Sequence, residues 1–532
     1  MRSSVDAIVV RDNRVFAYGW AYSPKAAINK LRLDLLLVDG EKVQLPVSFG
    51  KLRDDVEQAF PGELNSRNSG WMVYSAWEGA AAKSIALSGE FDDGSAVSTL
   101  LYSPVQAQAL AVAPMTFISR VAARARCWFG NAKEVEVVQP VYTAPEATDH
   151  VAYAIDCVRR ELSEANQSRC TLIIDHTMGG GANLFSKQWM SARAATQPVM
   201  LRLSFDIPSL RFSLNIVLND RVERFYFSND QIVRELSRLT LIDEVFYNDA
   251  VSFPRPEAVP VWLSAFKRDL NIKLTIAVHD YLAICPSQFL LNDEGRFCAV
   301  PDLSECEWCL PRNENEFAPL FAARSISDWR RRWSAALFDA DEIICFSASS
   351  KNLLLRAYPD LAENRVRVQP HRVQPFVNMP LIDRHAPLHL GVVGAINFHK
   401  GARVIQALAA EIARQKLPVR ITVIGSIEVP CDTTVLNSTG PFDREALPDL
   451  MEEAGVNLCF LPSICPETFS YVTEEIMSLR MPLACFNLGA PADRVRAYEF
   501  GRVISCQEAG PLLESLQQFH QQLSLASFPQ SL

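Results

Sequence analysis

The sequence lacks long hydrophobic runs: no stretch reaches the roughly 18 apolar residues that a membrane-spanning helix needs. Its N-terminus also lacks the apolar core and the small-residue cleavage site of a secretory signal, and reads MRSSVDAIVVRDNRVF. We therefore expect a cytoplasmic protein. In that reducing compartment, the 13 cysteines are expected to be buried thiols or metal ligands, not a disulfide framework.

Basic charge is also scarce. The chain has 52 Lys and Arg against 61 Asp and Glu, a formal net charge of −9. A nucleic-acid-binding protein needs a clustered basic surface, so this balance argues against a nucleic-acid partner. A small anionic ligand held by one or two cations is still compatible with it. At 532 residues the chain is too long for one hydrophobic core, and we expect three domains.

Residues 1–104 show the period of two that is typical of β-strands. Alternating leucines at Leu31–Leu37 are followed by an Asp39-Gly40 turn and by a second apolar run at Val43–Val47. This pattern predicts a β-hairpin. Further short apolar runs between Asp, Asn and Gly residues predict an antiparallel β-sandwich for the whole segment.

Residues 105–150 break this pattern and are predicted to form a linker. The stretch Pro114–Ala132 mixes arginines with aromatic residues, as in an amphipathic helix. Such a helix can pack between domains, or it can lie on an anionic membrane surface. Peripheral membrane association is therefore left open.

From Thr171 onwards, short apolar strands alternate with stretches of helix length. The alternation predicts parallel βαβ units, arranged as one Rossmann-like domain over 151–380 and a second over 381–532. In such sheets the ligand binds at the carboxyl ends of the strands. We therefore expect the functional residues at those ends.

The strongest single motif is PSICPETFSYVTEEIMSL, in which Glu467 and Glu475 lie eight residues apart where a strand gives way to a helix. If both were helical, they would lie about 12 Å apart along one face. One acid could then contact a sugar and the other a ribose. The N–H groups of Thr468, Phe469 and Ser470 are expected at the helix N-terminus, where they could bind a diphosphate. A capped surface helix with acidic residues in its first turns is the alternative.

Two glycine-containing loops follow other strands. The first is GVVGAINFHKG, where a strand ends at Gly394 and Lys400 stands before a helix, in position to reach a phosphate. The second is HTMGGGAN, where Gly179, Gly180 and Gly181 would let a ligand approach the backbone closely. This loop lacks the G-x-G-x-x-G spacing, which disfavours a nicotinamide cofactor.

The segment KLTIAVHDYLAICP places His279 at a strand end, as a site residue or as a structural histidine. The loop after it contains Cys285, Cys298, Cys306 and Cys309, and the last pair has the spacing of metal ligands. These cysteines could bind a structural zinc ion. Buried free thiols would give the same pattern.

Residues from about 170 to 505 resemble the retaining glycosyltransferases of family 4, often labelled glycosyl transferases group 1, of bacterial surface-polysaccharide synthesis. The resemblance rests on the motif from Glu467 to Glu475, the loop Gly394–Gly401, the HTMGGGAN loop and the HDYLAICP segment. It implies a GT-B fold, with two Rossmann-like domains that hold the acceptor and the nucleotide sugar. The preceding β-domain looks like accessory domains of some bacterial glycosyltransferases.

The resemblance also implies roles for these residues. Glu467 would contact the transferred sugar, Glu475 the ribose and Lys400 the diphosphate. His279 would lie beside the donor sugar, and the backbone of Gly179–Gly181 would face the phosphates. No catalytic metal is implied, because positive charge and helix dipoles stabilise the departing diphosphate.

The implied reaction transfers a hexose from a nucleoside-diphosphate sugar to a glycan or lipid-linked glycan acceptor, with retention of configuration, in O-antigen or capsule synthesis. One position departs from the family pattern. Ala395 stands where the family usually has an arginine after the glycine, and His399, Arg403 or a residue of the other half would have to supply that charge. The departure favours an alternative, a non-catalytic glycan-binding or scaffold subunit of a polysaccharide synthase.

Overall fold

The computed structural model describes residues 1–51, 53–63, 65–92, 94–102, 150–218, 221–315, 317–429 and 434–525. The predicted linker, with its helix over Pro114–Ala132, lies outside these residues except for position 150. The chain forms two compact units. The first contains Met1–Phe49, Gly70–Cys345 and Lys351–Gln369, and the second contains Gly50–Ser69, Phe346–Ser350 and Pro370–Leu532.

The N-terminal segment forms the predicted antiparallel sandwich. Its elements are β1 (Arg2–Arg11), β2 (Arg14–Tyr22), β3 (Ile28–Leu37), β4 (Lys42–Pro46), β5 (Ser48–Lys51), α1 (Asp54–Ala59), β6 (Gly70–Ala76), β7 (Ala82–Phe91) and β8 (Ala96–Tyr102). One sheet has the order β1-β2-β6-β5 and the other β4-β3-β7-β8. Alternate residues of both sheets, Trp71 and Leu33 among them, are buried in one shared core, which holds the sheets face to face.

The first α/β half is built on an eight-stranded sheet of order β12-β11-β10-β9-β13-β14-β15-β16. Its strands are β9 (Cys170–Ile174), β10 (Val199–Asp206), β11 (Arg211–Leu218), β12 (Arg221–Phe227), β13 (Ile242–Tyr247), β14 (Lys273–Val278), β15 (Glu342–Cys345) and β16 (Val366–Val368). Its helices are α4 (His150–Glu164), α5 (Gly180–Arg193), α6 (Gln231–Leu236), α7 (Val259–Leu270), α8 (Leu303–Cys309), α9 (Ile326–Asp339) and α10 (Ala348–Ala357).

The expectation of parallel βαβ units holds for β10, β9, β13, β14, β15 and β16 but is wrong for β11 and β12, which pair antiparallel. Only a short turn separates β10 from β11. In it the Asp206 carboxylate accepts the Ser209 N–H at 3.1 Å, and Leu210 takes a left-handed φ of 51°. A parallel connection needs a long crossover, so this turn can only make a hairpin.

Helices cover both faces of the parallel part of this sheet. α7 and α9 pack against each other, and α7 also contacts β13 and β14. On α5, Trp189 stacks on Phe246 of β13 with ring centroids 4.5 Å apart, and Phe185 lies against the same ring. The strands β9, β13 and β14 are thus buried from both sides, which explains their continuous apolar runs.

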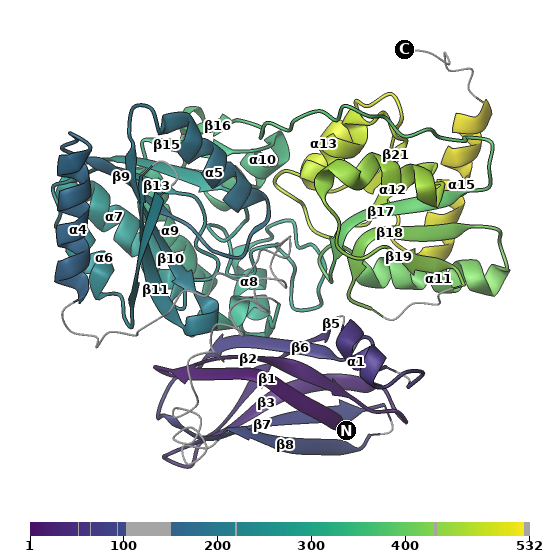
Figure 1. Ribbon diagram of the computed structural model, residues 1–532, viewed down its shortest axis with the longest axis horizontal. Coiled ribbons are helices and arrows are strands. Elements are labelled where there is room, and N and C mark those ends of the chain that lie inside the picture. The colour runs from purple at the N-terminus through teal and green to yellow at the C-terminus, as the bar shows by residue number, and fades with distance from the viewer. Residues whose placement is uncertain are drawn as a thin grey trace. The chain divides into compact units, whose positions relative to one another are not determined.

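The second α/β half has a six-stranded, all-parallel sheet of order β19-β18-β17-β20-β21-β22. Figure 1 shows its elements in green to yellow: β17 (His389–Ile396), α11 (Ala402–Gln415), β18 (Arg420–Ile427), β19 (Leu436–Ser438), α12 (Leu447–Ala454), β20 (Leu458–Leu461), α13 (Tyr471–Ser478), β21 (Leu483–Phe486), α14 (Gly489–Val495), β22 (Gly501–Ile504) and α15 (Ala509–Leu525). Single 3₁₀ turns in the described chain lie at Ile207–Ser209, Pro256–Ala258, Leu310–Arg312, Ala318–Leu320, Glu363–Arg365 and Arg444–Ala446.

Two separate cores line the two faces of this sheet. One joins the strands to α11 and α15, and the other joins them to α12, α13 and α14. This is the doubly wound arrangement of a Rossmann-like domain. The predicted fold class, GT-B preceded by an antiparallel β-sandwich, is therefore confirmed in its elements.

The sandwich and the first α/β half share contacts within the first unit. The Tyr74 hydroxyl on β6 donates to the Ser252 carbonyl at 2.9 Å, and its ring stacks on Phe205 of β10. Phe16 and Tyr18 of β2 belong to the same apolar core as the α/β strands. No helix among the described residues is long and apolar enough to cross a membrane.

Candidate functional site

The carboxyl end of β9 carries a buried polar network centred on Asp175. Its Oδ1 accepts hydrogen bonds from the backbone N–H of His176 at 2.9 Å, from the Asn183 side chain at 3.0 Å and from the Asn248 side chain at 2.9 Å. Its Oδ2 lies 3.0 Å from the Arg202 guanidinium. Because Asp175 and Asn248 are fully buried, these partners compensate for the lost hydration of the carboxylate and fix the loops after β9 and β13.

The predicted glycine loop opens α5, as expected. Gly179 precedes the helix with a φ of 82°, and its N–H donates to Asn183 Oδ1 at 2.6 Å. Gly180 has a φ of 79°, and a Cβ added there would meet no heavy atom within 4 Å. Glycine is needed here because a side chain would be strained at such φ values. The loop thus leaves its backbone, together with that of Gly181, accessible to a ligand.

His279 directly follows β14 and joins the same network. Its Nε2 lies 2.9 Å from Asn248 Oδ1, and its ring packs edge-on against Phe185 with centroids 5.1 Å apart. The Asn248 amide nitrogen already donates to Asp175 and to the Ala182 carbonyl, so its oxygen must be the acceptor. His279 therefore carries a proton on Nε2. Sequence reasoning placed this histidine at a strand end but did not find Asn248.

Two further carboxyl groups lie at this end of the sheet. Burial raises the pKa of Asp249 to about 8, with a further contribution from the nearby Asp280. Burial likewise raises the pKa of Asp280 to about 7. His176 Nε2 lies 3.6 Å from Asp249, while its Nδ1 accepts the Met178 N–H at 3.1 Å. Near neutral pH, protonated carboxyl groups here can donate hydrogen bonds to a ligand hydroxyl.

The four loop cysteines are neighbours in the folded chain. Burial raises the pKa of Cys285 to about 12, with smaller contributions from Cys298 and Cys306, and raises the pKa of Cys298 to about 11, with contributions from Cys306 and Cys309. Arg330 donates to Cys306 Sγ at 3.6 Å. Within the described ranges, however, no three His, Cys, Asp or Glu side chains are arranged as a set of metal ligands.

In the second half, the loop after β17 contains Lys400. Gly394 has a φ of 116° with open space at its Cβ position, and Gly401 has a φ of 84° and lies so close to Pro462 that an added Cβ would be 2.0 Å from the Pro462 carbonyl oxygen. The Lys400 ammonium forms no ion pair within the described chain, so it can serve a ligand. Ala395 of β17 is exposed.

Glu467 lies in the loop between β20 and α13. Its Oε1 accepts a hydrogen bond from the Ser463 hydroxyl, and its carbonyl oxygen accepts the Ala490 N–H at 2.9 Å. The Ile464 N–H donates to the His399 carbonyl at 3.0 Å, which ties this loop to the one that carries Lys400. The two sequence-predicted donor residues are therefore brought onto adjoining loops.

The expected start of α13 is wrong by three residues. The helix begins at Tyr471, and Ser470 is its N-cap, with a hydroxyl that accepts the Thr473 N–H at 3.4 Å. Thr468 and Phe469 precede the helix and so do not supply its first-turn N–H groups. Nor do Glu467 and Glu475 share a helix face, because only the second of them is helical.

The Phe469 side chain is buried against His371. The two rings are stacked with centroids 4.5 Å apart, and the Arg494 guanidinium covers the Phe469 ring at 4.1 Å. His371 Nδ1 also lies 2.7 Å from the Tyr471 hydroxyl. Burial, assisted by the charge of Arg494, lowers the pKa of His371 to about 3. A neutral histidine therefore ties the connector before β17 to the start of α13.

Glu475 forms an ion pair that the sequence did not reveal. The Arg444 Nε lies 2.7 Å from Glu475 Oε1, and the glutamate side chain is 12% exposed. Arg444 also donates to the Gln374 carbonyl, and its guanidinium lies 4.1 Å from the centroid of the Phe376 ring. The residue expected at the ribose is thus held by an arginine.

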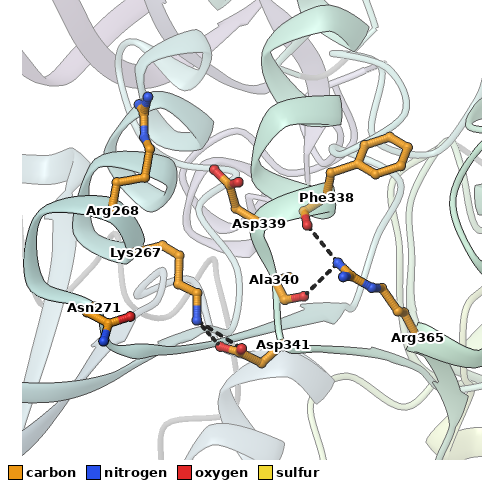
Figure 2. A pocket seen from close by; sticks show the side chains of 8 residues that line it. All are labelled: Lys267, Arg268, Asn271, Phe338, Asp339, Ala340, Asp341 and Arg365. Carbon is orange, nitrogen blue, oxygen red and sulfur yellow. Dashed lines mark hydrogen bonds and ion pairs between the residues drawn. The ribbon is translucent and has the colours of Figure 1, made fainter.

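A cavity of about 530 Å³ in the first half lies away from these residues, at the C-terminal ends of α7 and α9. Figure 2 shows the interactions among its lining residues: the Lys267 ammonium bonds both oxygens of Asp341, and Arg365 donates to the carbonyls of Phe338 and Ala340. Its location is the edge opposite the carboxyl ends of the strands. It contains none of the predicted site residues.

No family model and no curated protein matches the chain. Solved structures similar to it include Anabaena HepE in complex with UDP-glucose, with 14% identity over 66% of this chain and 90% of that one and a TM-score of 0.43. The lipopolysaccharide outer core galactosyltransferase WaaB has 10% identity over 67% and 91%, with a TM-score of 0.42. A glycosyltransferase of Rickettsia africae ESF-5 has 12% identity over 67% and 89%, with a TM-score of 0.40.

Proposed function

We propose that the protein is a nucleotide-sugar-dependent glycosyltransferase. The observation that carries the proposal is the pair of adjoining loops after β17 and β20, which present the Lys400 ammonium and the Ser463-bonded carboxylate of Glu467. A cation and a positioned acid at the carboxyl ends of parallel strands suit the diphosphate and the hydroxyls of a donor sugar. The family resemblance points to the same chemistry.

In the proposed reaction, Lys400 stabilises the charge that develops on the departing nucleoside diphosphate. Glu467 accepts hydrogen bonds from hydroxyls of the transferred sugar, and Glu475 binds the ribose. By the resemblance, His279 of the first half, with its proton on Nε2, would also face the sugar. By the resemblance, configuration is retained, the leaving oxygen helps to deprotonate the acceptor hydroxyl, and the residues described here perform this without a catalytic metal.

We propose a glycan or lipid-linked glycan of bacterial O-antigen or capsule synthesis as the acceptor, and a cytoplasmic location. The polar side chains at the carboxyl ends of β9, β13 and β14 support an acceptor with hydroxyl groups, because such side chains donate and accept hydrogen bonds. The acceptor would then bind in the first half. Association with the membrane surface is a further proposal that depends on the linker.

The test is to incubate the purified protein with a panel of nucleotide sugars and to measure thermal shift and release of nucleoside diphosphate. Lys400→Ala and Glu467→Gln should each lower turnover at least about tenfold, because each removes a charged contact of the transition state. Lys83→Ala, an exposed lysine of β7, serves as the matched control. Wild-type turnover in both site variants would refute the proposed donor site.

The alternative function is a non-catalytic glycan-binding or scaffold subunit. One observation favours it: the exposed Ala395 leaves the expected arginine position without a charge. The same panel separates the two functions. Binding of a nucleotide sugar or glycan without any diphosphate release would support the alternative.

We also propose a structural zinc ion at Cys285, Cys298, Cys306 and Cys309. Two features support it: after burial, neighbouring loop thiols also raise the pKa of Cys285 and of Cys298, and α8, which carries Cys306 and Cys309, buries none of its own residues. A metal would tie α8 to the rest of this loop. The thiols would have to draw together to bind it, since the described structure contains no such ligand set.

A further inference from the structure

The Glu475 carboxylate has one protein partner among the described residues, and that partner is Arg444. The Arg444 Nε donates to Oε1 at 2.7 Å, whereas no hydrogen bond to Oε2 is present in the part of the chain that the structure describes. Glu475 lies in the first turns of α13, and its side chain is only 12% exposed. A carboxylate this buried needs charged or polar partners to replace its lost hydration.

Arg444 is itself held from three directions. Besides Glu475 it donates to the Gln374 carbonyl, and its guanidinium lies 4.1 Å from the centroid of the Phe376 ring. Stacking and hydrogen bonding together fix the plane of a guanidinium, which a lysine in its place could not reproduce. Glu475 Oε1 is thus bonded to a donor whose own orientation is fixed.

We propose that Arg444 is a positioning residue for the nucleotide: it holds Glu475 so that Oε2 accepts a hydrogen bond from a ribose hydroxyl of the nucleoside diphosphate. The inference rests on the proposed function, which assigns Glu475 to the ribose. A carboxylate can accept several hydrogen bonds, so the arginine and the ribose do not compete for it. Because the carboxylate is already ordered, binding loses less conformational entropy.

The opposite arrangement is an arginine that blocks the ribose site until it is displaced. The two arrangements predict opposite effects of removing Arg444 on nucleotide affinity. If Arg444 positions Glu475, Arg444→Ala weakens nucleotide binding because it leaves a mostly buried carboxylate unpaired and rotationally free. If Arg444 blocks the site, the same change strengthens binding.

The test is a binding cycle by isothermal titration calorimetry that compares UDP with 2′,3′-dideoxy-UDP. If thermal shift shows stronger binding of GDP or ADP than of UDP, that nucleotide and its 2′,3′-dideoxy analogue are used instead. In the wild-type protein, loss of the ribose hydroxyls should weaken binding about 10- to 100-fold, as expected for a hydrogen bond to a charged group. Glu475→Gln should weaken binding of the ribonucleotide and have little effect on the dideoxy nucleotide.

Arg444→Ala should weaken ribonucleotide binding about tenfold and dideoxy-nucleotide binding less than about twofold, with Arg444→Lys in between. Arg414→Ala, which removes an exposed arginine paired to Glu411 on α11, is the matched control and should change neither. An equal penalty for both nucleotides would mean that Arg444 acts only on stability. Tighter binding would mean that it blocks the site. Either result overturns the inference.

The outcome separates this inference from the proposed function. If wild-type protein binds both nucleotides equally and Glu475→Gln has no effect, the ribose role of Glu475 is wrong and the inference fails with it. If turnover still depends on Lys400 and Glu467, the proposed glycosyltransferase function would remain supported. If no nucleoside diphosphate binds at all, both are refuted.

Discussion

Gly489→Ala should damage the donor site without altering any residue that touches the ligand. Gly489 begins α14 with a φ of 60°, and an added Cβ would lie 2.6 Å from the Pro466 carbonyl carbon and 2.7 Å from both the nitrogen and the oxygen of Glu467. All three are backbone atoms, so no side chain can rotate away. The segment that carries Glu467 must shift, or α14 must.

The magnitude follows from comparison with Gly455, the residue after α12. Its φ of 71° is nearly the same, but the nearest atom to its Cβ position is His389 Nδ1 at 4.0 Å. Gly455→Ala should therefore cost only the left-handed strain, about 1 kcal/mol. Gly489→Ala adds overpacking, typically about 1–3 kcal/mol, for a total of about 2–4 kcal/mol.

Urea unfolding and diphosphate release would measure the two consequences. We expect Gly489→Ala to lower the urea midpoint more than Gly455→Ala does, and to lower turnover at least about tenfold because small displacements of a catalytic group are costly. Gly455→Ala should keep wild-type turnover. Identical behaviour of the two variants would show that α14 does not support Glu467 in the way described.

Three further outcomes are expected. The folded-state pKa of Asp249, about 8 against an ordinary 3.8, means that the native protein keeps a proton that the unfolded chain has lost. The stability that protonated Asp249 contributes is complete below about pH 4 and is lost as the pH rises through 8. Melting temperatures should therefore fall between these pH values, and the decrease should be smaller in Asp249→Asn. Elemental analysis should find about one zinc per chain, lost in Cys306→Ser but kept in the buried control Cys345→Ser; absence of zinc would make the four loop cysteines free thiols. Removal of residues 1–149 deletes Tyr74, which stacks on Phe205 of the first α/β half, so the melting temperature should fall. An unchanged melting temperature would show that the first α/β half does not depend on the sandwich for its stability.

The sequence predicts elements well where one local rule decides the structure. Alternating leucines identify β3, and apolar runs between turn residues identify β9, β13 and β14, because burial on one face or on both imposes those periods. The start of α13 was missed for a different reason. Thr468 and Ser470 are both suitable N-caps, and only the extended backbone of Ser470, with φ −151°, shows which of them caps the helix.

The site was predictable only in part. The position of Lys400 and Glu467 follows from the rule that ligands bind at strand ends, and their loops do adjoin. Arg444 and Asn248 were missed because each acts across a long sequence separation, on Glu475 and His279 respectively. Their side chains look like ordinary surface or loop residues until packing brings them to their partners.

Under the proposed function, the charge at the diphosphate is a point at which this chain departs from the pattern that the resemblance implies. Arg444 is paired with Glu475, and the Arg403 guanidinium lies over the Phe398 ring at 5.2 Å. Lys400, in the loop after β17, forms no ion pair within the described chain and is the cation that the proposed function assigns to the diphosphate. A single ammonium binds a diphosphate weakly and with strong salt dependence.

Ala395→Arg should therefore tighten binding of a nucleoside diphosphate. Ala395 is exposed, and the Cβ position of the preceding Gly394 is open, so the longer side chain can be accommodated. A second cation, with a guanidinium that can donate two hydrogen bonds to a phosphate, should increase the affinity for the nucleoside diphosphate by about threefold to tenfold at low salt. This increase should become smaller as the salt concentration rises. Calorimetric titration with UDP at two salt concentrations would measure both effects, with Ala410→Arg, at an exposed site on α11, as the control for added charge. If Ala395→Arg leaves affinity unchanged, the diphosphate does not lie beside Gly394, and a different cation neutralises it.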